Sequence, residues 1–249
     1  FIETPCNPTL EHIDIALLAR VRDAIAKLQN HRPVLIVDNT FLPMYQRPLE
    51  HGADMVVYSI TKYISGNSRI TAGACLGSVE SVRSIKMFRG AFFGSITDPE
   101  TAVRILDSLE TLEMRMEKHV ANARLIAQFL QNHPKVERVY YPELLEVGSQ
   151  QHEIYKRQCD APGGMISFDV KGGKQEAFMF LNALHIIALA VSLGASESLA
   201  QNPFHHTHQG VDEKTKIHIG ISEKMIRLSV GFEHPNDLMW DLGQALERI

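Results

Sequence analysis

Residues of three different chemistries follow a hydrophobic stretch in the segment VVYSITKYISG, which spans residues 56–66. Ser59 and Thr61 carry hydroxyl groups, and Lys62 carries an amine that is a nucleophile once it has lost its proton. A second apolar stretch, VLIV at 34–37, ends at Asp38. The sequence therefore places an amine, a carboxylate and two hydroxyls directly after two hydrophobic runs.

Short apolar runs of this kind, bounded by polar or turn-forming residues, predict buried strands of a parallel sheet. Ligands of open α/β sheets bind outside the carboxyl ends of the strands, so we expect Asp38 and Lys62 at one edge. Taken singly, each residue also has a structural explanation. Asp38 is suited to capping a turn with Asn39 and Thr40, and Lys62 is suited to a solvated surface position. The combination with Ser59 and Thr61 favours a functional interpretation.

Pyridoxal phosphate is a cofactor that these groups suit. It needs a lysine for an imine, an acidic partner for the ring nitrogen, and donors for the phosphate. Asp38 would keep the ring nitrogen protonated, while Ser59 and Thr61 would donate hydrogen bonds to the phosphate with help from turn amides. Desolvation at the end of a buried strand would make Lys62 nucleophilic near neutral pH.

Composition excludes several other classes of function. The 249 residues are 45% hydrophobic and 22% charged, as in ordinary globular proteins. A net charge of −4 offers no basic field, so nucleic acid and membranes are not expected as partners. No apolar run reaches the roughly 18 residues of a membrane span. Three scattered cysteines predict a reduced, cytoplasmic protein without a zinc site.

The first half of the chain alternates predicted helices and strands, which indicates α/β architecture. Apolar residues recur at helical spacing over 13–28, and QRPLEHG predicts a short helix that ends at Gly52. A third strand is expected within 70–78. A long helix is expected from Asp98 to Asn132, with Pro99 at a favourable first position.

The second half has the pattern of an α+β domain on an antiparallel sheet. Strands are expected within 163–173, 186–194 and 225–233, and helices over 174–184 and 236–249. We place the boundary between a larger α/β domain, 1–115, and a smaller C-terminal domain, 116–249.

Several segments in the same order along the chain resemble one enzyme family. They include FIETPCNPT, VDNTFLPMYQRPLEHGADMVVYSITKYISG, SLETLEMRMEKHVANA, AVSLGASESLAQNPFHHTH and IRLSVGFEHPNDL. The chain resembles the cystathionine γ-synthase/γ-lyase and methionine γ-lyase family over essentially its whole length. These are pyridoxal-phosphate enzymes of sulfur amino-acid metabolism and transsulfuration. The resemblance implies a type I fold of PLP-dependent transferases, with an incomplete mixed-sheet α/β cofactor domain before the small α+β domain.

The resemblance also implies roles for cofactor-binding residues. Lys62 is similar to the imine-forming lysine, which also acts as the general base. Asp38 is similar to the partner of the pyridinium nitrogen, and Ser59 and Thr61 to phosphate ligands. Asn7, within ETPCNPT, is similar to an asparagine near the phenolic oxygen of the cofactor and the substrate carboxylate.

Two further residues are implied as substrate ligands. Arg227 is similar to an arginine that binds the substrate carboxylate, a task that suits its planar, two-pronged donors. Ser192 is similar to a residue that contacts the same carboxylate. The alternative for Arg227 is a surface ion pair.

Val191 bears on the choice of reaction. Cystathionine-handling relatives tend to carry glutamate there, so valine indicates a carbon–sulfur lyase for methionine-like or homocysteine-like substrates, with a 2-oxo acid, ammonia and a thiol as products. Core packing is the other explanation of Val191.

A γ-replacement transferase of the cystathionine γ-synthase or O-acylhomoserine sulfhydrylase type is the alternative activity. A catalytically silent structural or oligomerisation fragment is an alternative of another class. A nucleotide-binding module is disfavoured because no glycine-rich loop follows a strand.

Three expectations remain. Family members carry a long N-terminal portion before the segment that resembles FIETPCNPT, and that portion is expected to complete the cofactor site. Homotetramers, formed as dimers of dimers, are expected from the resemblance alone. The histidines at 205, 206, 208 and 218 have no cysteine or paired carboxylate nearby in sequence, so we expect no metal site.

Overall fold

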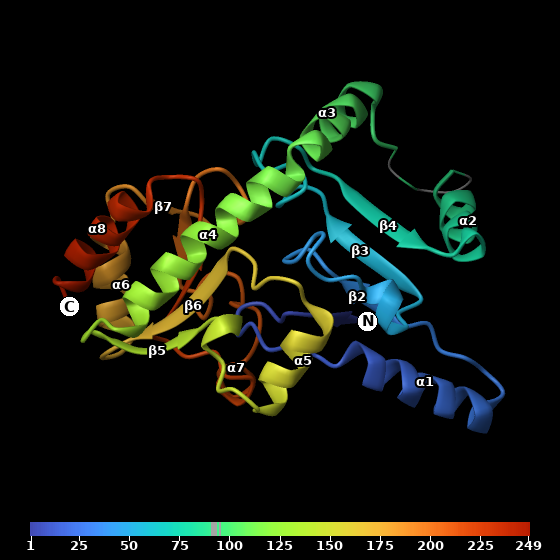
Figure 1. Cartoon of the computed structure of the whole chain (residues 1–249), viewed down its shortest axis with the longest axis horizontal. Helices are drawn as coiled ribbons and strands as arrows, with labels where there is room; N and C mark the ends of the chain where they lie inside the picture. Colours follow the sequence, from blue (N-terminus) through green and yellow to red (C-terminus); the bar gives the residue numbers. More distant parts are fainter. Residues whose placement is uncertain (91–93, 95) are drawn as a thin grey trace.

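The computed structural model describes residues 1–90, 94 and 96–249, and its strands form two separate sheets (Figure 1). The first sheet has the order β1-β2-β3-β4. β1, β2 and β3 are mutually parallel, while β4 is antiparallel to β3. The bounds are Ile2–Glu3 for β1, Ile36–Asp38 for β2, Met55–Ser59 for β3 and Gly73–Gly77 for β4. The parallel pairing of the two apolar runs confirms the α/β prediction.

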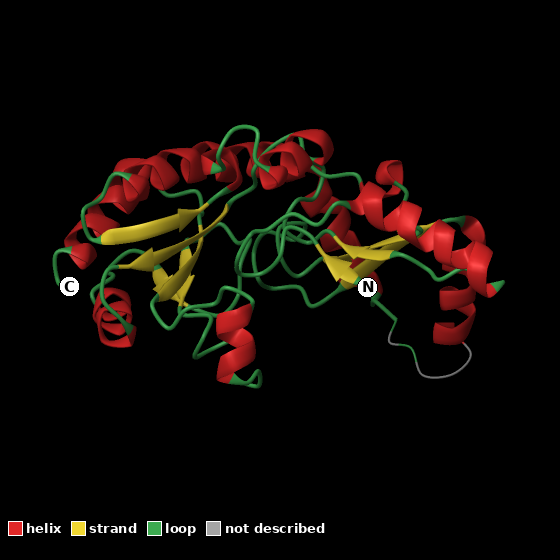
Figure 2. Cartoon of the chain, turned by 90° about the horizontal axis from the view of Figure 1, so that it is seen from below, coloured by secondary structure: helices red, strands yellow, loops and turns green. Residues whose placement is uncertain are grey.

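The second sheet has the order β5-β6-β9-β8-β7 and is antiparallel except for the parallel pair β7 and β8. Its strands are β5 Val136–Tyr140, β6 Met165–Val170, β7 Ala188–Leu189, β8 Leu199–Gln201 and β9 Met225–Ser229. Figure 2 shows the two groups of strands well apart, with loops filling the region between them. The predicted domain boundary at residues 115 and 116 stays a prediction.

Eight α-helices cover these sheets in the described part of the chain. They are α1 Ile15–Gln29, α2 Val79–Phe88, α3 Pro99–Glu110, α4 Leu112–Gln131, α5 Gln150–Gln158, α6 Lys174–Asn182, α7 Glu213–His218 and α8 Pro235–Leu246. Short 3₁₀ helices occupy Pro48–His51, which ends at Gly52 as expected, and Pro142–Leu144. None of the described helices is long and apolar enough to cross a membrane.

Two predicted elements differ from the structure. The helix expected from 98 to 132 is divided into α3 and α4, because Thr111 leaves helical geometry with φ −108° and ψ 4°. Asp98 caps α3 by accepting a hydrogen bond from the Thr101 amide, and Pro99 takes the first position as expected. The strand expected within 186–194 shrinks to Ala188–Leu189, because the following backbone carbonyls accept hydrogen bonds from Arg227.

The core of the second sheet lies between α4, α6, α8 and the strands, and includes Phe168, Phe180, Ile126 and Leu242. β6 is buried along its whole length, including its polar residues. Ser167 donates to the Pro8 carbonyl at 2.6 Å, and Asp169 accepts from the Tyr140 hydroxyl at 2.8 Å. These bonds satisfy polar groups that burial would otherwise leave unpaired.

A second hydrophobic cluster joins the two halves of the chain next to Lys62. Tyr63 is fully buried against Met116 of α4, Met165 of β6 and Leu193. Burying a large apolar side chain contributes about 1.5–3 kcal/mol. The turn that follows β3 is therefore fixed against both the long helix and the second sheet.

Candidate functional site

Lys62 lies in a tight turn at the carboxyl end of β3. Its amide donates to the Ser59 carbonyl at 3.2 Å, and its carbonyl accepts from the Gly66 amide at 2.8 Å. Gly66 has a φ of +66°, a left-handed conformation that favours glycine. The half-buried Lys62 side chain donates from Nζ to Ser192 Oγ at 3.0 Å. Burial, followed by the charge of Arg227, lowers the pKa of Lys62. Lys62 is therefore not the solvated surface amine of the structural alternative.

Arg227 lies in the middle of β9, and only 2% of the residue is exposed. Its guanidinium donates from Nη1 to Asn7 Oδ1 at 3.1 Å, and from Nη2 to the carbonyls of Val191 at 3.0 Å and Ser192 at 3.1 Å. Burial lowers its pKa to about 10, so the group stays charged near neutral pH. No carboxylate pairs with it among the described residues, and the surface ion-pair alternative is wrong.

Gln201 of β8 is a further partner of Arg227 that sequence reasoning missed. A guanidinium has only donors, so the Gln201 amide must present its oxygen to it. In that orientation the oxygen accepts from Arg227 Nη2 at 2.9 Å and from Thr207 Oγ1 at 3.2 Å. Thr207 in turn contacts His208 Nδ1 at 3.1 Å. A signal was present in the buried strand LAQ, where a polar glutamine follows two apolar residues.

Asp38 ends β2, next to Val57 of β3 in the parallel register. Its Oδ1 accepts from the Thr40 amide at 2.9 Å, and Thr40 Oγ1 accepts from the Ser59 amide at 2.9 Å. Asp38 thus does stabilise a turn, as its structural explanation held. Its second oxygen has no protein hydrogen-bond partner within residues 1–90, 94 and 96–249. The Asp38 and Thr40 side chains together therefore link the ends of β2 and β3, and Asp38 keeps one acceptor oxygen available.

Glu3 is a second carboxyl group at this edge, and the sequence interpretation did not weigh it. It lies directly opposite Asp38 in the parallel pairing of β1 and β2. Residues paired in this way place their side chains on the same face of the sheet. Burial, followed by the charge of Asp38, raises the pKa of Glu3 to about 7, against an opposing contribution of Arg227. Glu3 is therefore partly protonated near neutral pH.

The two predicted phosphate ligands differ in how they are held. Thr61 Oγ1 accepts from the Ala72 amide at 3.2 Å and contacts the Ala72 carbonyl at 3.5 Å, which ties the turn to the segment before β4. The Ser59 hydroxyl has no protein partner in the described part of the chain and is available to donate. Both phosphate-binding roles stay predictions.

The loop that presents Ser192 is held from both ends. The Asp241 carboxylate of α8 accepts hydrogen bonds of 2.8–2.9 Å from three consecutive backbone amides, those of His185, Ile186 and Ile187. Beyond the loop, the Gly194 amide donates to Ser229 Oγ at 2.8 Å. These bonds fix the chain on both sides of Ser192, the residue that contacts Lys62.

Val191, in the same loop, is 59% exposed in this chain. Its backbone carbonyl accepts a hydrogen bond from Arg227, while its side chain is not packed in the interior. Core packing is therefore the wrong explanation of Val191. The other explanation is left, in which Val191 provides an apolar group at the surface of the site.

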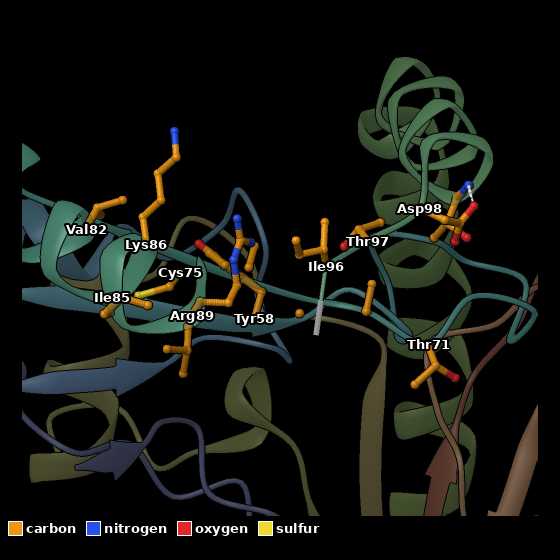
Figure 3. A pocket seen from close by; sticks show the side chains of 15 residues that line it. Tyr58, Thr71, Cys75, Val82, Ile85, Lys86, Arg89, Ile96, Thr97 and Asp98 are labelled. Carbon is orange, nitrogen blue, oxygen red and sulfur yellow. Dashed lines mark hydrogen bonds between the residues drawn. The ribbon is translucent and has the colours of Figure 1, made fainter. Parts of the chain in front are cut away.

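A cavity of about 680 Å³ lies elsewhere, between β4, α2 and the start of α3 (Figure 3). Its lining includes Tyr58, Cys75, Lys86, Arg89 and Asp98. Lys62, Asp38 and Arg227 do not line it, so we place the candidate site at the ends of β2 and β3.

Among the described residues, no three or more His, Cys, Asp or Glu side chains come together in a way that could hold a metal ion, and the expectation of no metal site stays a prediction. The His205 ring makes tilted contacts with the rings of Phe204 and Phe178.

The structure therefore brings Lys62, Ser192, Arg227 and Asn7 into one hydrogen-bonded network. It places Asp38, Glu3 and Ser59 on the neighbouring ends of β1, β2 and β3. The network combines a half-buried amine with a buried guanidinium that has no anionic partner among the described residues. Such a set can take up a carboxylate and move a proton at the amine.

Comparison with known proteins agrees with this geometry. Residues 1–247 match the model of the family described as Cys/Met metabolism PLP-dependent enzyme. The chain is 42% identical to an L-methionine gamma-lyase of Pseudomonas putida over 99% of its length, and 43% identical to a cystathionine gamma-lyase of Rattus norvegicus over 99%. It spans 61% of the length of each of these relatives.

Solved structures of cystathionine gamma synthase and cystathionine gamma-lyase also resemble this chain. A cystathionine gamma synthase from Xanthomonas oryzae pv. oryzae, in complex with aminoacrylate and cysteine, superimposes with a TM-score of 0.91 at 36% identity. A cystathionine gamma-lyase from Lactobacillus plantarum, complexed with L-serine, gives 0.89 at 35% identity. The matches cover 99% of this chain and 62% and 63% of those chains. This chain belongs to the Cys/Met metabolism family of PLP-dependent enzymes, and its fold is the mixed α/β fold predicted from the sequence.

Proposed function

We propose that the protein is a pyridoxal-phosphate-dependent carbon–sulfur lyase that acts on methionine-like or cystathionine-like amino acids. The observation that carries the proposal is the network in which Lys62 Nζ bonds Ser192 Oγ while Ser192 O accepts from the buried Arg227. The network places a nucleophilic amine beside a cation that lacks an anion among the described residues. An α-amino acid carries the complementary carboxylate next to the carbon that must lose its proton.

The residues present fit pyridoxal phosphate. The pKa of Lys62 is lowered by burial, which favours the neutral amine that reacts with an aldehyde. One Asp38 oxygen and the Ser59 hydroxyl have no protein partner in the described chain, and both have the chemistry that a ring nitrogen and a phosphate require. Lys62 would hold this cofactor, which would supply electron withdrawal from the substrate carbon next to the amino group.

Lys62 is the residue that would remove the proton from that carbon. Its partner Ser192 Oγ, at 3.0 Å, holds the amine at one point of the site. Desolvation brings the pKa of the amine towards the operating pH, which is where a general base is most effective.

Arg227 and Asn7 would bind and orient the substrate carboxylate. All the present acceptors of Arg227 are neutral: the Asn7 amide, the Gln201 amide and two loop carbonyls. A carboxylate would replace some of them with charge-assisted bonds, which are about twice as strong. Substrate binding would thus loosen the Arg227 contacts of Val191 and Ser192.

Val191 supports a substrate with an apolar distal group. Its backbone carbonyl bonds Arg227 while its apolar side chain is exposed, and a charged distal amino acid would gain no partner from that side chain. This favours methionine-like substrates over cystathionine.

A γ-replacement transferase is the second candidate, because the superimposed Xanthomonas structure is a cystathionine gamma synthase. A lyase and a transferase share the early proton transfers and differ in whether water or a thiol completes the reaction. We further propose a cytoplasmic homotetramer, for which the family resemblance is the support.

Product analysis tests the proposal. The intact protein, supplied with pyridoxal phosphate, is expected to release 2-oxobutyrate and a thiol from methionine, and Lys62→Ala is expected to abolish both this turnover and borohydride fixation of the cofactor. Lys118→Ala removes an exposed lysine of α4 and serves as the matched control. Thioether formation from an O-acylhomoserine and a thiol would select the transferase. Absence of fixation in the unmutated protein would select a silent structural unit.

A further inference from the structure

The backbone of the Lys62 turn has two carbonyls that its internal bonds do not use. The Ser65 amide bonds the Ile60 carbonyl at 2.8 Å, and the Gly66 amide bonds the Lys62 carbonyl at 2.8 Å. The carbonyls of Tyr63 and Ile64 have no backbone partner in the described chain. Carbonyls of buried residues require another donor.

Arg115 of α4 supplies that donor. Its Nη1 donates to the Tyr63 carbonyl at 2.5 Å, and its Nη2 donates to the Ile64 carbonyl at 2.8 Å. The two carbonyls directly follow Lys62 in the chain. A planar guanidinium holds two acceptors in a fixed relative position, which a lysine amine cannot do.

The guanidinium is itself held by the junction between α3 and α4. Nη2 also donates to the Ser108 carbonyl at 2.7 Å, and Nε donates to Thr111 Oγ1 at 3.1 Å. No carboxylate pairs with Arg115 in the described residues, and burial lowers its pKa from the ordinary value. Arg115 is a half-buried cation that binds backbone carbonyls and has no acidic partner among the described residues. Its role is therefore to hold the backbone of the Lys62 turn in place.

We propose that Arg115 is a positioning residue for Lys62, which fixes the Lys62 turn against the break between α3 and α4. The proposal rests on the lyase function proposed above. Arg115 acts through the backbone, because its bonds go to residues 63 and 64 and not to the amine. Gly66 supports this role, because the Arg115 guanidinium packs so closely against it that a Cβ at this position would overlap the guanidinium.

The first test measures how the intact protein, loaded with pyridoxal phosphate, reacts at Lys62. Arg115→Ala is expected to lower the rate of cofactor linkage, followed by absorbance and borohydride fixation, by at least about tenfold, because small misplacements of a reacting group cost that much. The loss is expected in kcat more than in KM. Arg115→Lys, which keeps the charge without the fork, is expected to recover only part of the rate.

Arg124→Ala is the matched control, because it removes another arginine of α4 whose bonds go to the exposed Glu143 carboxylate at 2.6 and 2.8 Å. It is expected to leave linkage unchanged. Should Arg115→Ala fail to fold, Thr111→Val removes only the hydroxyl that orients the guanidinium, and a smaller loss of about two- to fivefold is expected. Full activity in Arg115→Lys, or an equal loss in Arg124→Ala, would overturn the proposal.

Amide hydrogen exchange separates this proposal from the proposed function. In Arg115→Ala the amides of Ser65 and Gly66 are expected to exchange faster than in Arg124→Ala, whether or not the cofactor is present. Faster exchange without any cofactor linkage in the unmutated protein would refute the lyase proposal and retain the role of Arg115 in fixing the turn. Unchanged exchange would refute that role of Arg115 alone.

Discussion

Lys62 Nζ lies 3.0 Å from Ser192 Oγ, although the two residues are 130 positions apart in the chain. One residue comes from the turn after β3, and the other from the loop after β7. The amine and the loop hydroxyl thus meet only when both halves of the chain have folded against each other.

Ser192→Ala is expected to reduce kcat by about 10- to 100-fold. A hydrogen bond to a charged group contributes about 1.5–3 kcal/mol, and its loss frees the amine from a defined position. Steady-state kinetics with methionine would measure the loss. Ser196→Ala, a change in the same loop region without an Arg227 or Lys62 contact, is the control, and equal losses in the two variants would contradict the role of Ser192.

Glu3→Gln is expected to remove a titration near pH 7. Because the pKa of Glu3 is raised to about 7, the side chain gains a negative charge beside Asp38 as the pH rises through that value. The absorption spectrum of the cofactor bound to the intact protein, titrated from pH 5 to pH 9, would show this step. A step of the same midpoint and size in Glu3→Gln would assign it to another group, such as Lys62.

The same residue affects the free energy of unfolding. Between pH 4.5 and pH 7 the folded protein holds a proton on Glu3 that the unfolded chain has released. The free energy of unfolding should therefore fall as the pH rises through this window, and Glu3→Gln should remove that contribution. Urea unfolding at pH 5 and pH 8 would compare the two proteins.

His119 is expected to have the opposite effect on stability. Burial lowers its pKa from 6.5 to about 4, while its Nδ1 contacts the Val230 carbonyl at 2.6 Å. The unfolded chain therefore binds a proton between pH 6.5 and pH 4 that the folded protein excludes, and stability is lost as the pH falls through this range. In urea unfolding, His119→Gln should reduce the fall in the free energy of unfolding between pH 6.5 and pH 4. Replacement of the exposed His31 should leave it unchanged.

Val191→Glu is expected to shift preference from methionine towards cystathionine. A carboxylate at this exposed position would attract the distal ammonium group of cystathionine, and exposed ion pairs contribute about 0.2–1 kcal/mol. The ratio of kcat/KM for the two substrates should change by up to about fivefold. Val191→Leu keeps the position apolar, and the same shift in that variant would refute the explanation by charge.

The local patterns of the sequence predicted the strand that ends at Asp38 and the strand that precedes the Lys62 turn, because short apolar runs between turn-forming residues favour buried strands. They did not predict the break at Thr111, since the periodicity continues through it and tertiary contacts decide its geometry. Glu3 was missed because its strand has only two residues, too few for a period. Gln201 and Arg115 were missed because their roles depend on distant acceptors that sequence spacing cannot locate.

The bond between Asn7 and Arg227 spans 220 positions of the chain. Synthesis must have passed Arg227, 220 positions after Asn7, before these two groups can meet, and long-range contacts of this kind also form slowly. Under the proposed function, the pocket for the substrate carboxylate should therefore form later than the Lys62 turn, so that an emerging chain exposes this lysine before it can hold an amino acid.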